Sequence, residues 1–179
     1  HEVTTIDPEK KTVTVKNLDT DEIKEDNYDT LVFATGAKPT SPAIEGVDQA
    51  HVFHVRTIQH AVAIDKYMKA EKPKKATIIG AGFIGLEMAE QLTHKGLEVT
   101  IIQRGNQIMP YLDKDMAFRV EEHLRKQNVT LVLNEEAATI SEKTVETKNG
   151  KVIDSDIVFL ATGVKPNTIR GEFKFLQRA

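Results

Sequence analysis

KATIIGAGFIGLE, residues 75–87, determines how the whole chain is interpreted. It contains a short apolar run, three glycines in the spacing G-x-G-x-x-G, and the start of a helical pattern. In a dinucleotide-binding turn, Gly80 allows the tight exit from a strand, Gly82 lets the backbone approach a pyrophosphate, and Gly85 lets the helix pack closely on the sheet. The free N–H groups and the positive dipole end of that helix would then face the phosphates.

The sequence on either side of the glycines supports a dinucleotide site. A predicted strand at residues 75–79 leads directly into them, and a predicted helix at 83–95 follows and closes at Gly96. Residues 97–102 favour a second strand, which completes a βαβ unit of about 30 residues. Because G-x-G-x-x-G occurs in many loops, the alternative is a structural glycine turn in an unrelated α/β protein.

Composition and charge exclude several classes of function. The 179 residues are 40% hydrophobic and 28% charged, and their net charge of −3 gives no electrostatic case for nucleic acid or an anionic membrane. No apolar run approaches the about 20 residues of a membrane span, and we expect a cytoplasmic protein. The chain has no cysteine, which excludes a disulfide, a thiolate metal site and a thiol catalyst within it. His51 and His54 share a short segment without a supporting ligand pattern, so we expect no metal site.

The remaining sequence predicts a mixture of strands and helices. Residues 3–6 and 11–15 alternate like antiparallel strands, residues 19–27 form a polar segment, and residues 28–34 favour a buried strand. Residues 40–46 indicate a linker, marked by proline. The other predicted elements are a strand at 51–55, helices at 57–72 and 114–127, a meander at 129–133, 137–140, 144–147 and 152–153, and a buried strand at 156–161.

The helix predicted at 114–127 has a mixed surface. Asp113 is its expected N-cap, and the pair Glu121-Glu122 is expected to face solvent. The residues expected on its apolar side are Met116, Phe118, Val120 and Leu124.

One stretch occurs twice. Residues 31–39, LVFATGAKP, align with residues 158–166, VFLATGVKP, and both follow a meander-like region. Internal repetition usually reflects duplicated architecture, so we interpret the chain as two related dinucleotide-binding modules, the first present only as its closing meander and strand. The alternative is a chance similarity between two buried strands.

These motifs resemble the pyridine nucleotide-disulfide oxidoreductases, flavoproteins in which an FAD domain surrounds an inserted NAD(P)H domain. The resemblance runs from His1 to about Asn167 and is closest to the branch of NADH oxidases, NADH peroxidases and coenzyme A-disulfide reductases. Its most specific parts are residues 80–87, residues 111–115 and the two A-T-G-x-K-P turns. The expected fold is α/β: a Rossmann-like NAD(P)-binding domain with a parallel sheet, helices and an antiparallel meander, preceded by a β-rich remnant of an FAD-binding domain.

The resemblance implies domain boundaries. Residues 1–43 would be the incomplete FAD-binding domain, residues 44–167 the NAD(P)H-binding domain, and residues 168–179 an unassigned tail. Because His1 is not an initiator methionine, we expect the chain to be a piece of a longer protein.

The resemblance also implies roles for individual residues. Glu87 would orient the nicotinamide for hydride transfer to the flavin, and Ile84 would pack near the nicotinamide end. Tyr111 would lie on the adenosine side. The residues implied to bind NAD(P)H are Gly80, Gly82, Phe83, Ile84, Gly85, Gln103, Arg104, Tyr111, Thr162 and Gly163, and those implied on the FAD side are Thr35 and Gly36.

Several of these residues have a simpler interpretation. Glu87 on a first helical turn is favourable for the helix dipole whether or not a ligand binds. Tyr111 is alternatively an ordinary, partly buried aromatic residue. Thr35 and Thr162 are alternatively residues that only cap strand ends.

The end of the second strand of the βαβ unit departs from the NAD pattern. An NAD-specific site places Asp or Glu about 20 residues after the glycines, whereas this chain has Gln103 followed by Arg104. Arginine pairs with a 2′-phosphate by charge-assisted hydrogen bonds, so we hypothesise NADPH use or dual use. The alternative is that Arg104 only points into solvent.

The predicted function is therefore the NAD(P)H-binding portion of an FAD-dependent oxidoreductase. By resemblance, the longer protein would be a homodimer that passes hydride from NAD(P)H to flavin and electrons on to coenzyme A disulfide, oxygen or peroxide. This chain lacks a redox cysteine and a first glycine fingerprint, so we expect it to be inactive alone, to bind nicotinamide nucleotide weakly and to bind FAD hardly at all. The alternative from another class is a non-catalytic module that senses nicotinamide nucleotide.

Overall fold

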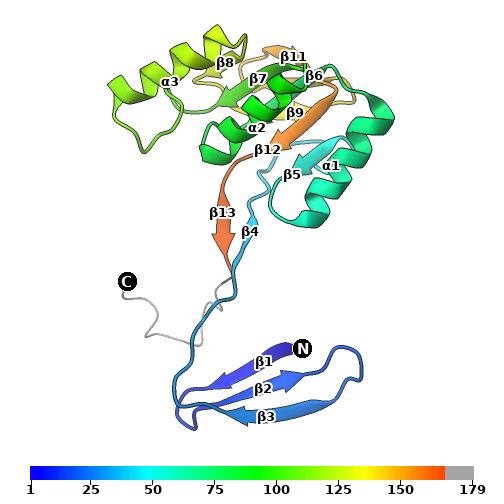
Figure 1. Cartoon of the computed structure of the whole chain (residues 1–179), viewed down its shortest axis with the longest axis vertical. Coiled ribbons are helices and arrows are strands. Elements are labelled where there is room, and N and C mark those ends of the chain that lie inside the picture. The colour runs from blue at the N-terminus through cyan, green and yellow to red at the C-terminus, as the bar shows by residue number, and fades with distance from the viewer. Residues whose placement is uncertain (168–179) are drawn as a thin grey trace. The chain divides into compact units, whose positions relative to one another are not determined.

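The computed structural model describes residues 1–167 as two compact units, one from His1 to Gly36 and one that begins at Ala37 (Figure 1). The expected tail, residues 168–179, lies outside the described residues. Within residues 1–167, the helices are too short or too polar to cross a membrane.

The first unit is a three-stranded antiparallel sheet of β1 (Glu2–Asp7), β2 (Thr12–Lys16) and β3 (Ile23–Asn27). A carboxylate oxygen of Asp7 accepts the N–H groups of Glu9 and Lys10 at 3.1 and 2.9 Å, which closes the turn between β1 and β2. The predicted pair of antiparallel strands is confirmed. β3 was not predicted, because its polar residues are all exposed and leave no apolar alternation to identify it.

The prediction of a buried strand at residues 28–34 is wrong. Residues 28–36 form no strand, and Val32 is 80% exposed. A strand forms where its backbone groups pair with a neighbour. In the described part of the first unit, strand pairing is confined to β1, β2 and β3.

The second unit is built on a five-stranded parallel sheet in the order β5-β12-β6-β7-β8. β12 lies between β5 and β6, and all of its residues are buried. The strands are β5 (Val52–His54), β6 (Lys75–Ile79), β7 (Glu98–Gln103), β8 (Thr130–Leu133) and β12 (Ile157–Leu160).

β8 corrects the predicted meander. It pairs with β7 in the parallel sheet, whereas β9 (Ala137–Ile140), β10 (Thr144–Thr147) and β11 (Val152–Asp154) form a separate antiparallel sheet. Short alternating strands of either sheet look alike in sequence, so the choice of neighbour was decided by packing. The hairpin at Asn149-Gly150 is confirmed between β10 and β11.

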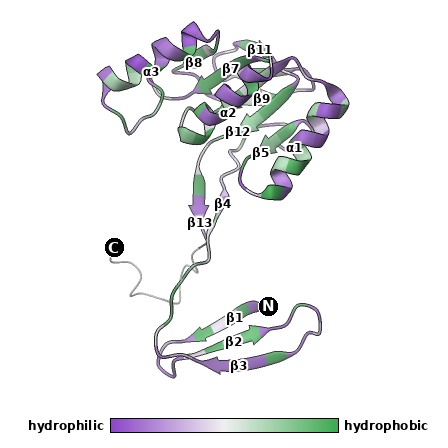
Figure 2. Ribbon diagram, in the orientation of Figure 1, coloured by the Kyte–Doolittle hydropathy of each residue, from purple (hydrophilic) through white to green (hydrophobic). Residues whose placement is uncertain are grey.

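The parallel sheet is covered on both faces (Figures 1 and 2). Helices α1 (Ile58–Glu71), α2 (Phe83–His94) and α3 (Lys114–Lys126) pack on one face, and the sheet of β9, β10 and β11 packs on the other. Successive strand residues point to opposite faces. Ile78 and Phe159 therefore join the helix-side core, while Ile79 and Leu160 join the core under the antiparallel sheet. The α/β fold with a parallel sheet and an antiparallel meander is confirmed.

The apolar side predicted for α3 is partly wrong. Met116 and Phe118 are 51% and 60% exposed, whereas the buried residues are Ala117, Glu121 and Leu124. The buried stripe follows the spacing four-then-three, and the large residues Met116 and Phe118 fall outside it despite their size. Asp113 occupies the N-cap position but makes no side-chain cap hydrogen bond.

The closing residues of the two repeat copies pair with each other within the second unit. β4 (Ala37–Pro39) pairs antiparallel with β13 (Val164–Pro166), and the predicted linker at 40–46 follows β4 directly. The hydroxyl of Thr162 donates to the carbonyl of Thr40 at 2.7 Å, and the N–H of Thr40 donates to the carbonyl of Gly163 at 3.0 Å.

Candidate functional site

The glycine loop lies at the carboxyl ends of the parallel strands, where β6 and β12 are neighbours. The N–H of Gly80 donates to the carbonyl of Ile102 at 2.9 Å, and Gly80 has a left-handed φ of +106°. A Cβ on Gly80 would collide with the carbonyl of Ala161, just after β12. Gly80 is therefore required by the chain itself, because two strand ends approach each other here.

Gly85 is also required by the chain. It is buried in the first turn of α2, and a Cβ there would collide with the carbonyl of Gly80. Because Gly85 has no Cβ, the first turn of α2 can pack directly against the glycine loop that precedes it.

Gly82 differs from both. It has an ordinary backbone conformation, φ −85° and ψ −174°, and a Cβ placed on it would meet no atom within 4 Å. Gly82 is the N-cap of α2, and it supplies no side-chain hydrogen bond to the helix start. The first N–H groups of a helix lack intrahelical partners, so open space lies beside a set of backbone donors at the positive dipole end. This arrangement suits an anionic group that approaches the backbone closely.

Both backbone polar groups of Ala81 make hydrogen bonds. Its N–H donates to the side-chain oxygen of Gln103 at 3.2 Å, and its carbonyl accepts the N–H of Met109 at 2.8 Å. Gln103, at the end of β7, is half-buried. Because its side-chain oxygen accepts the hydrogen bond from Ala81, its side-chain NH₂ group is the part left to meet a ligand. Position 103 thus presents a donor where an NAD-type carboxylate would present acceptors. Arg104, the next residue, is exposed.

The predicted residues of α2 form an exposed edge. Phe83 is 67% exposed, Ile84 is 42% exposed, and Glu87 is exposed one turn further on. The first turn of α2 contains no acidic residue. The helix-dipole interpretation of Glu87 is therefore weakened, because that effect falls off within the first turn.

Tyr111 lies on the loop between β7 and α3, and it is 90% exposed. Its alternative as a partly buried aromatic residue is wrong. An aromatic ring left in solvent on this loop is available to a ligand.

Of the other predicted residues, Gly163 has a φ of +99° and no atom within 4 Å of a would-be Cβ. The hydroxyl of Thr162 donates to the carbonyl of Thr40, as the strand-end interpretation of Thr162 expected. Thr35 and Gly36 are exposed and belong to the first unit.

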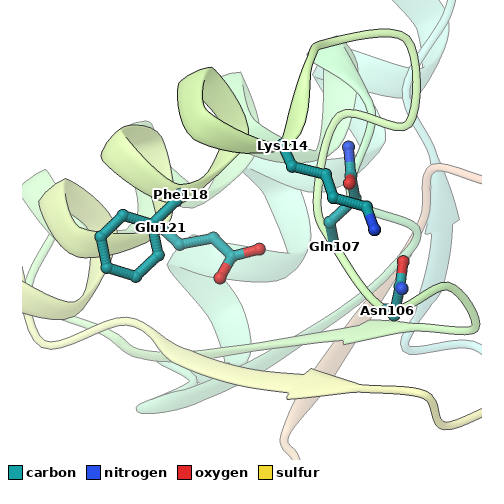
Figure 3. Close-up of a pocket in the computed structure, with 5 residues that line it drawn as sticks. All are labelled: Asn106, Gln107, Lys114, Phe118 and Glu121. Carbon is teal, nitrogen blue, oxygen red and sulfur yellow. The ribbon is translucent and has the colours of Figure 1, made fainter.

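Sequence reasoning missed Glu121. Although expected in solvent, this residue is only 9% exposed, and its carboxylate accepts the N–H of Ile108 at 3.2 Å. Figure 3 shows Glu121 beside a shallow pocket of about 180 Å³ between α3 and the preceding loop. The available signal was its place on the buried stripe with Ala117 and Leu124. The pocket is lined by Asn106, Gln107, Lys114, Phe118 and Glu121.

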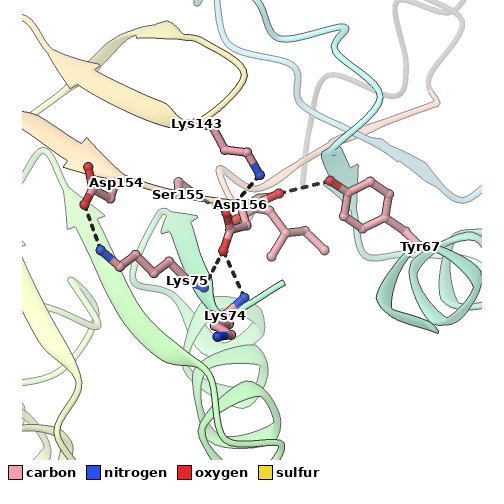
Figure 4. A network of polar contacts seen from close by, with 8 residues as sticks. Tyr67, Lys74, Lys75, Lys143, Asp154, Ser155 and Asp156 are labelled. Atoms are coloured by element: carbon pink, nitrogen blue, oxygen red, sulfur yellow. Dashed lines mark hydrogen bonds and ion pairs between the residues drawn. The ribbon is translucent and has the colours of Figure 1, made fainter. Parts of the chain in front are cut away.

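A second polar cluster lies at the amino ends of β6 and β12, the opposite edge of the sheet (Figure 4). The carboxylate of Asp156 accepts the N–H groups of Lys74 and Lys75 at 2.9 and 3.0 Å and the ammonium of Lys143 at 3.1 Å. The hydrogen bond from the Lys74 backbone is the largest cause that lowers the pKa of Asp156 to about 2, against the raising effect of burial. This cluster lies at the amino ends of β6 and β12, whereas the glycine loop lies at their carboxyl ends. We therefore interpret it as structural, because it holds the starts of the strands.

The histidines show no ligand arrangement. Burial lowers the pKa of both His51 and His54, and His54 lies 3.1 Å from the hydroxyl of Ser41 through its Nε2. Within residues 1–167, no group of three or more His, Asp or Glu side chains is placed to hold a metal ion.

The sequence of the chain is similar to a known protein family and to two named relatives. The sequence model described as "Pyridine nucleotide-disulphide oxidoreductase" matches residues 1–174. A protein named NADH oxidase from Methanocaldococcus jannaschii is 43% identical over 171 residues, which cover 93% of this chain and 38% of that protein. Coenzyme A disulfide reductase from Staphylococcus aureus is 36% identical over 168 residues, which cover 94% of this chain and 38% of that enzyme. The chain thus spans about 38% of the length of these relatives.

The fold is also similar to solved structures of oxidoreductases. Reduced CoADR-RHD from Bacillus anthracis matches with a TM-score of 0.84 and 41% identity, over 93% of this chain and 30% of that one. The water-forming NADH oxidase from Lactobacillus brevis, bound to NADH, matches with a TM-score of 0.81 and 34% identity, over 93% of this chain and 38% of that one. An engineered NADPH oxidase made from it, bound to NADPH, matches with a TM-score of 0.81 and 33% identity, over the same shares.

Proposed function

The chain belongs to the pyridine nucleotide-disulphide oxidoreductase family, and from this we propose that residues 44–167 are the nicotinamide dinucleotide-binding domain of a longer FAD-dependent oxidoreductase. The observation that carries the proposal is Gly82. Its neighbours Gly80 and Gly85 are explained by contacts within the chain, whereas the missing Cβ of Gly82 faces open space at the start of α2. A pyrophosphate that approaches this backbone supplies the reason for a glycine there.

The described residues suit such a dinucleotide. The pyrophosphate would meet the N-terminal N–H groups of α2, and Gly163, which follows β12, leaves open space where a side chain would begin. When bound, the reduced cofactor supplies a hydride. Ile84 would pack near the nicotinamide, and Glu87 would orient the nicotinamide carboxamide by hydrogen bonding. Tyr111 would cover the adenosine side.

We further propose that the domain accepts NADPH as well as, or in preference to, NADH. The side-chain oxygen of Gln103 is engaged by Ala81, so position 103 offers a donor, and Arg104 adds a fixed positive charge beside it. A 2′-phosphate accepts hydrogen bonds and is negatively charged, so it suits both groups. The engineered NADPH-bound oxidase carries a change from aspartate to alanine followed directly by one from alanine to arginine, a similar loss of acid and gain of arginine.

The longer protein would hold FAD, to which Thr35 and Gly36 would contribute, and would act as a homodimer. Its electron acceptor would be coenzyme A disulfide or another disulfide, oxygen or peroxide. The name of the coenzyme A disulfide reductase supports a disulfide, and that of the water-forming NADH oxidase supports oxygen. Because the chain has no cysteine, the thiol that such chemistry uses would lie elsewhere in the longer protein, and the chain alone would be inactive.

Calorimetry with fragments of the cofactor tests both proposals. We expect the chain to bind 2′,5′-ADP about tenfold more tightly than 5′-AMP, because charged hydrogen bonds contribute about 1.5–3 kcal/mol each. Arg104→Ala should remove most of that preference and leave the affinity for 5′-AMP unchanged. Arg119→Ala, an exposed arginine on α3, is the matched control.

The outcomes separate the two proposals. Equal affinities for 2′,5′-ADP and 5′-AMP would reject NADPH use but not dinucleotide binding. Failure of NADH, NADPH and both fragments to bind would reject the dinucleotide site itself.

A further inference from the structure

The loop that follows β7 is hydrogen-bonded to the glycine loop through Met109. The N–H of Met109 donates to the carbonyl of Ala81 at 2.8 Å, and Ala81 directly precedes Gly82. Met109 adopts a left-handed φ of +46°, which a non-glycine residue rarely adopts. The hydrogen bond therefore depends on a backbone conformation that its surroundings must maintain.

Glu121 is the group that holds this backbone from the other side. Its carboxylate oxygen Oε1 accepts the N–H of Ile108, the residue before Met109, at 3.2 Å. Ile108 is fully buried, so its N–H has no route to water and needs a protein acceptor. The second carboxylate oxygen of Glu121 lies 3.7 Å from the guanidinium of Arg125.

A carboxylate this buried is unusual without a specific purpose. The neighbours of Glu121 on the buried stripe of α3 are the apolar residues Ala117 and Leu124. Packing beside these two apolar residues does not by itself require an acid at this position. The feature that an apolar residue cannot reproduce is the acceptor for Ile108.

We propose that Glu121 is a positioning residue for the dinucleotide. Its carboxylate fixes Ile108, Ile108 fixes the left-handed turn at Met109, and Met109 fixes the carbonyl of Ala81 and thus the backbone at Gly82. The same anchor orders the loop that carries Tyr111. This inference rests on the proposed dinucleotide site.

The loop has a second anchor that keeps the fold intact without Glu121. Ile108 is 0% exposed and Met109 is 6% exposed, and both belong to the helix-side core. Loss of the carboxylate should therefore disturb the backbone geometry at Met109 and Ala81 more than the folding of the domain.

The test compares Glu121→Ala, Glu121→Leu and Glu121→Gln with wild type. Glutamine keeps an oxygen acceptor, and leucine fills the space without one. Glu122→Ala is the control, because Glu122 is exposed on the same helix. The measurements are NADPH and 5′-AMP affinity by calorimetry at a temperature where every variant is folded, and hydrogen exchange of the peptide that covers residues 105–113.

We expect Glu121→Ala and Glu121→Leu to bind NADPH about tenfold more weakly, equivalent to about 1.4 kcal/mol, and to exchange faster in residues 105–113. Glu121→Gln should restore affinity to within about twofold of wild type, as should Glu122→Ala. Unchanged affinity in Glu121→Leu overturns the inference, even if that variant melts earlier, and so does an equal loss in Glu121→Gln. A wild-type chain that binds no nucleotide rejects the proposed function instead.

Discussion

Three glycines at residues 80, 82 and 85 look equivalent in the sequence, but they act on different partners. Gly80 and Gly85 prevent collisions with the carbonyls of Ala161 and Gly80. Gly82 prevents no collision within the described residues, because nothing lies within 4 Å of its would-be Cβ. Two glycines are thus constrained by folding, and one remains to be explained by a ligand.

Alanine substitution separates these roles. Gly82→Ala should change the free energy of unfolding by less than about 0.5 kcal/mol, since its φ of −85° suits alanine, yet weaken NADPH binding about tenfold. Gly85→Ala should destabilise the chain by about 1–3 kcal/mol through overpacking. Urea unfolding and calorimetry measure the two effects. A Gly82→Ala variant with unchanged affinity would contradict the pyrophosphate assignment.

At the scale of elements, the strands β6 and β12 have a polar anchor at one edge and the glycine loop at the other. The carboxylate of Asp156 accepts the backbone N–H groups of Lys74 and Lys75, where β6 starts. The hydroxyl of Tyr67 on α1 donates to the backbone carbonyl of Asp156 at 3.1 Å. Asp156 thus links the starts of β6 and β12 to the C-terminal half of α1. We expect these hydrogen bonds to help fix the register of β6 against β12. That register places Ala161 close to Gly80 at the carboxyl ends of the strands.

This anchor should make stability depend on acid pH. The pKa of Asp156 is lowered from 3.8 to about 2, so its contribution is fully present above about pH 4 and is lost as the pH falls toward 2. Asp156→Asn should lower the free energy of unfolding by about 1–2 kcal/mol at pH 7, and the difference from wild type should shrink between pH 4 and about 2.

Urea unfolding as a function of pH provides the measurement. Asp154→Asn is the control, because Asp154 and its partner Lys75 are 66% and 41% exposed, and such pairs contribute about 0–1 kcal/mol. A difference between Asp156→Asn and wild type that stays constant from pH 7 to pH 2 would rule out this role for the carboxylate.

At the scale of the whole molecule, the two units contribute unequally to the core. Every buried apolar residue of the described chain lies at Ile44 or beyond. The first unit holds its sheet together by strand pairing and exposed ion pairs such as Lys16 with Asp21 at 2.6 Å. Small sheets without a buried face are marginal by themselves.

A shortened chain that begins at Ala37 should therefore keep the fold and the site. We expect its melting temperature to stay within about 2–4 °C of the full chain, because no buried apolar side chain is removed. Its affinity for NADPH should equal that of the full chain. Differential scanning calorimetry and titration calorimetry check both values, and a collapse of either one would show that the first unit supports the second.

The sequence alone determined the parts of this protein that depend on local pattern. The βαβ unit, the helices and the glycine positions follow from short-range periodicity and turn chemistry, and the structure contains them where they were expected. The repeated A-T-G-x-K-P turns were also visible, although their pairing in β4 and β13 was not. The predicted roles of Glu87 and Arg104 stay predictions, as do the boundaries of the domains.

The tertiary structure decided what depends on neighbours distant in sequence. Residues 28–34 form no strand, while the second copy of the repeat begins in β12, a buried central strand, because only β12 lies between two pairing partners. Packing likewise placed β8 in the parallel sheet and turned Glu121 inward to Ile108. Strand pairing and burial of a polar group are satisfied by partners far along the chain, and local sequence does not specify those partners.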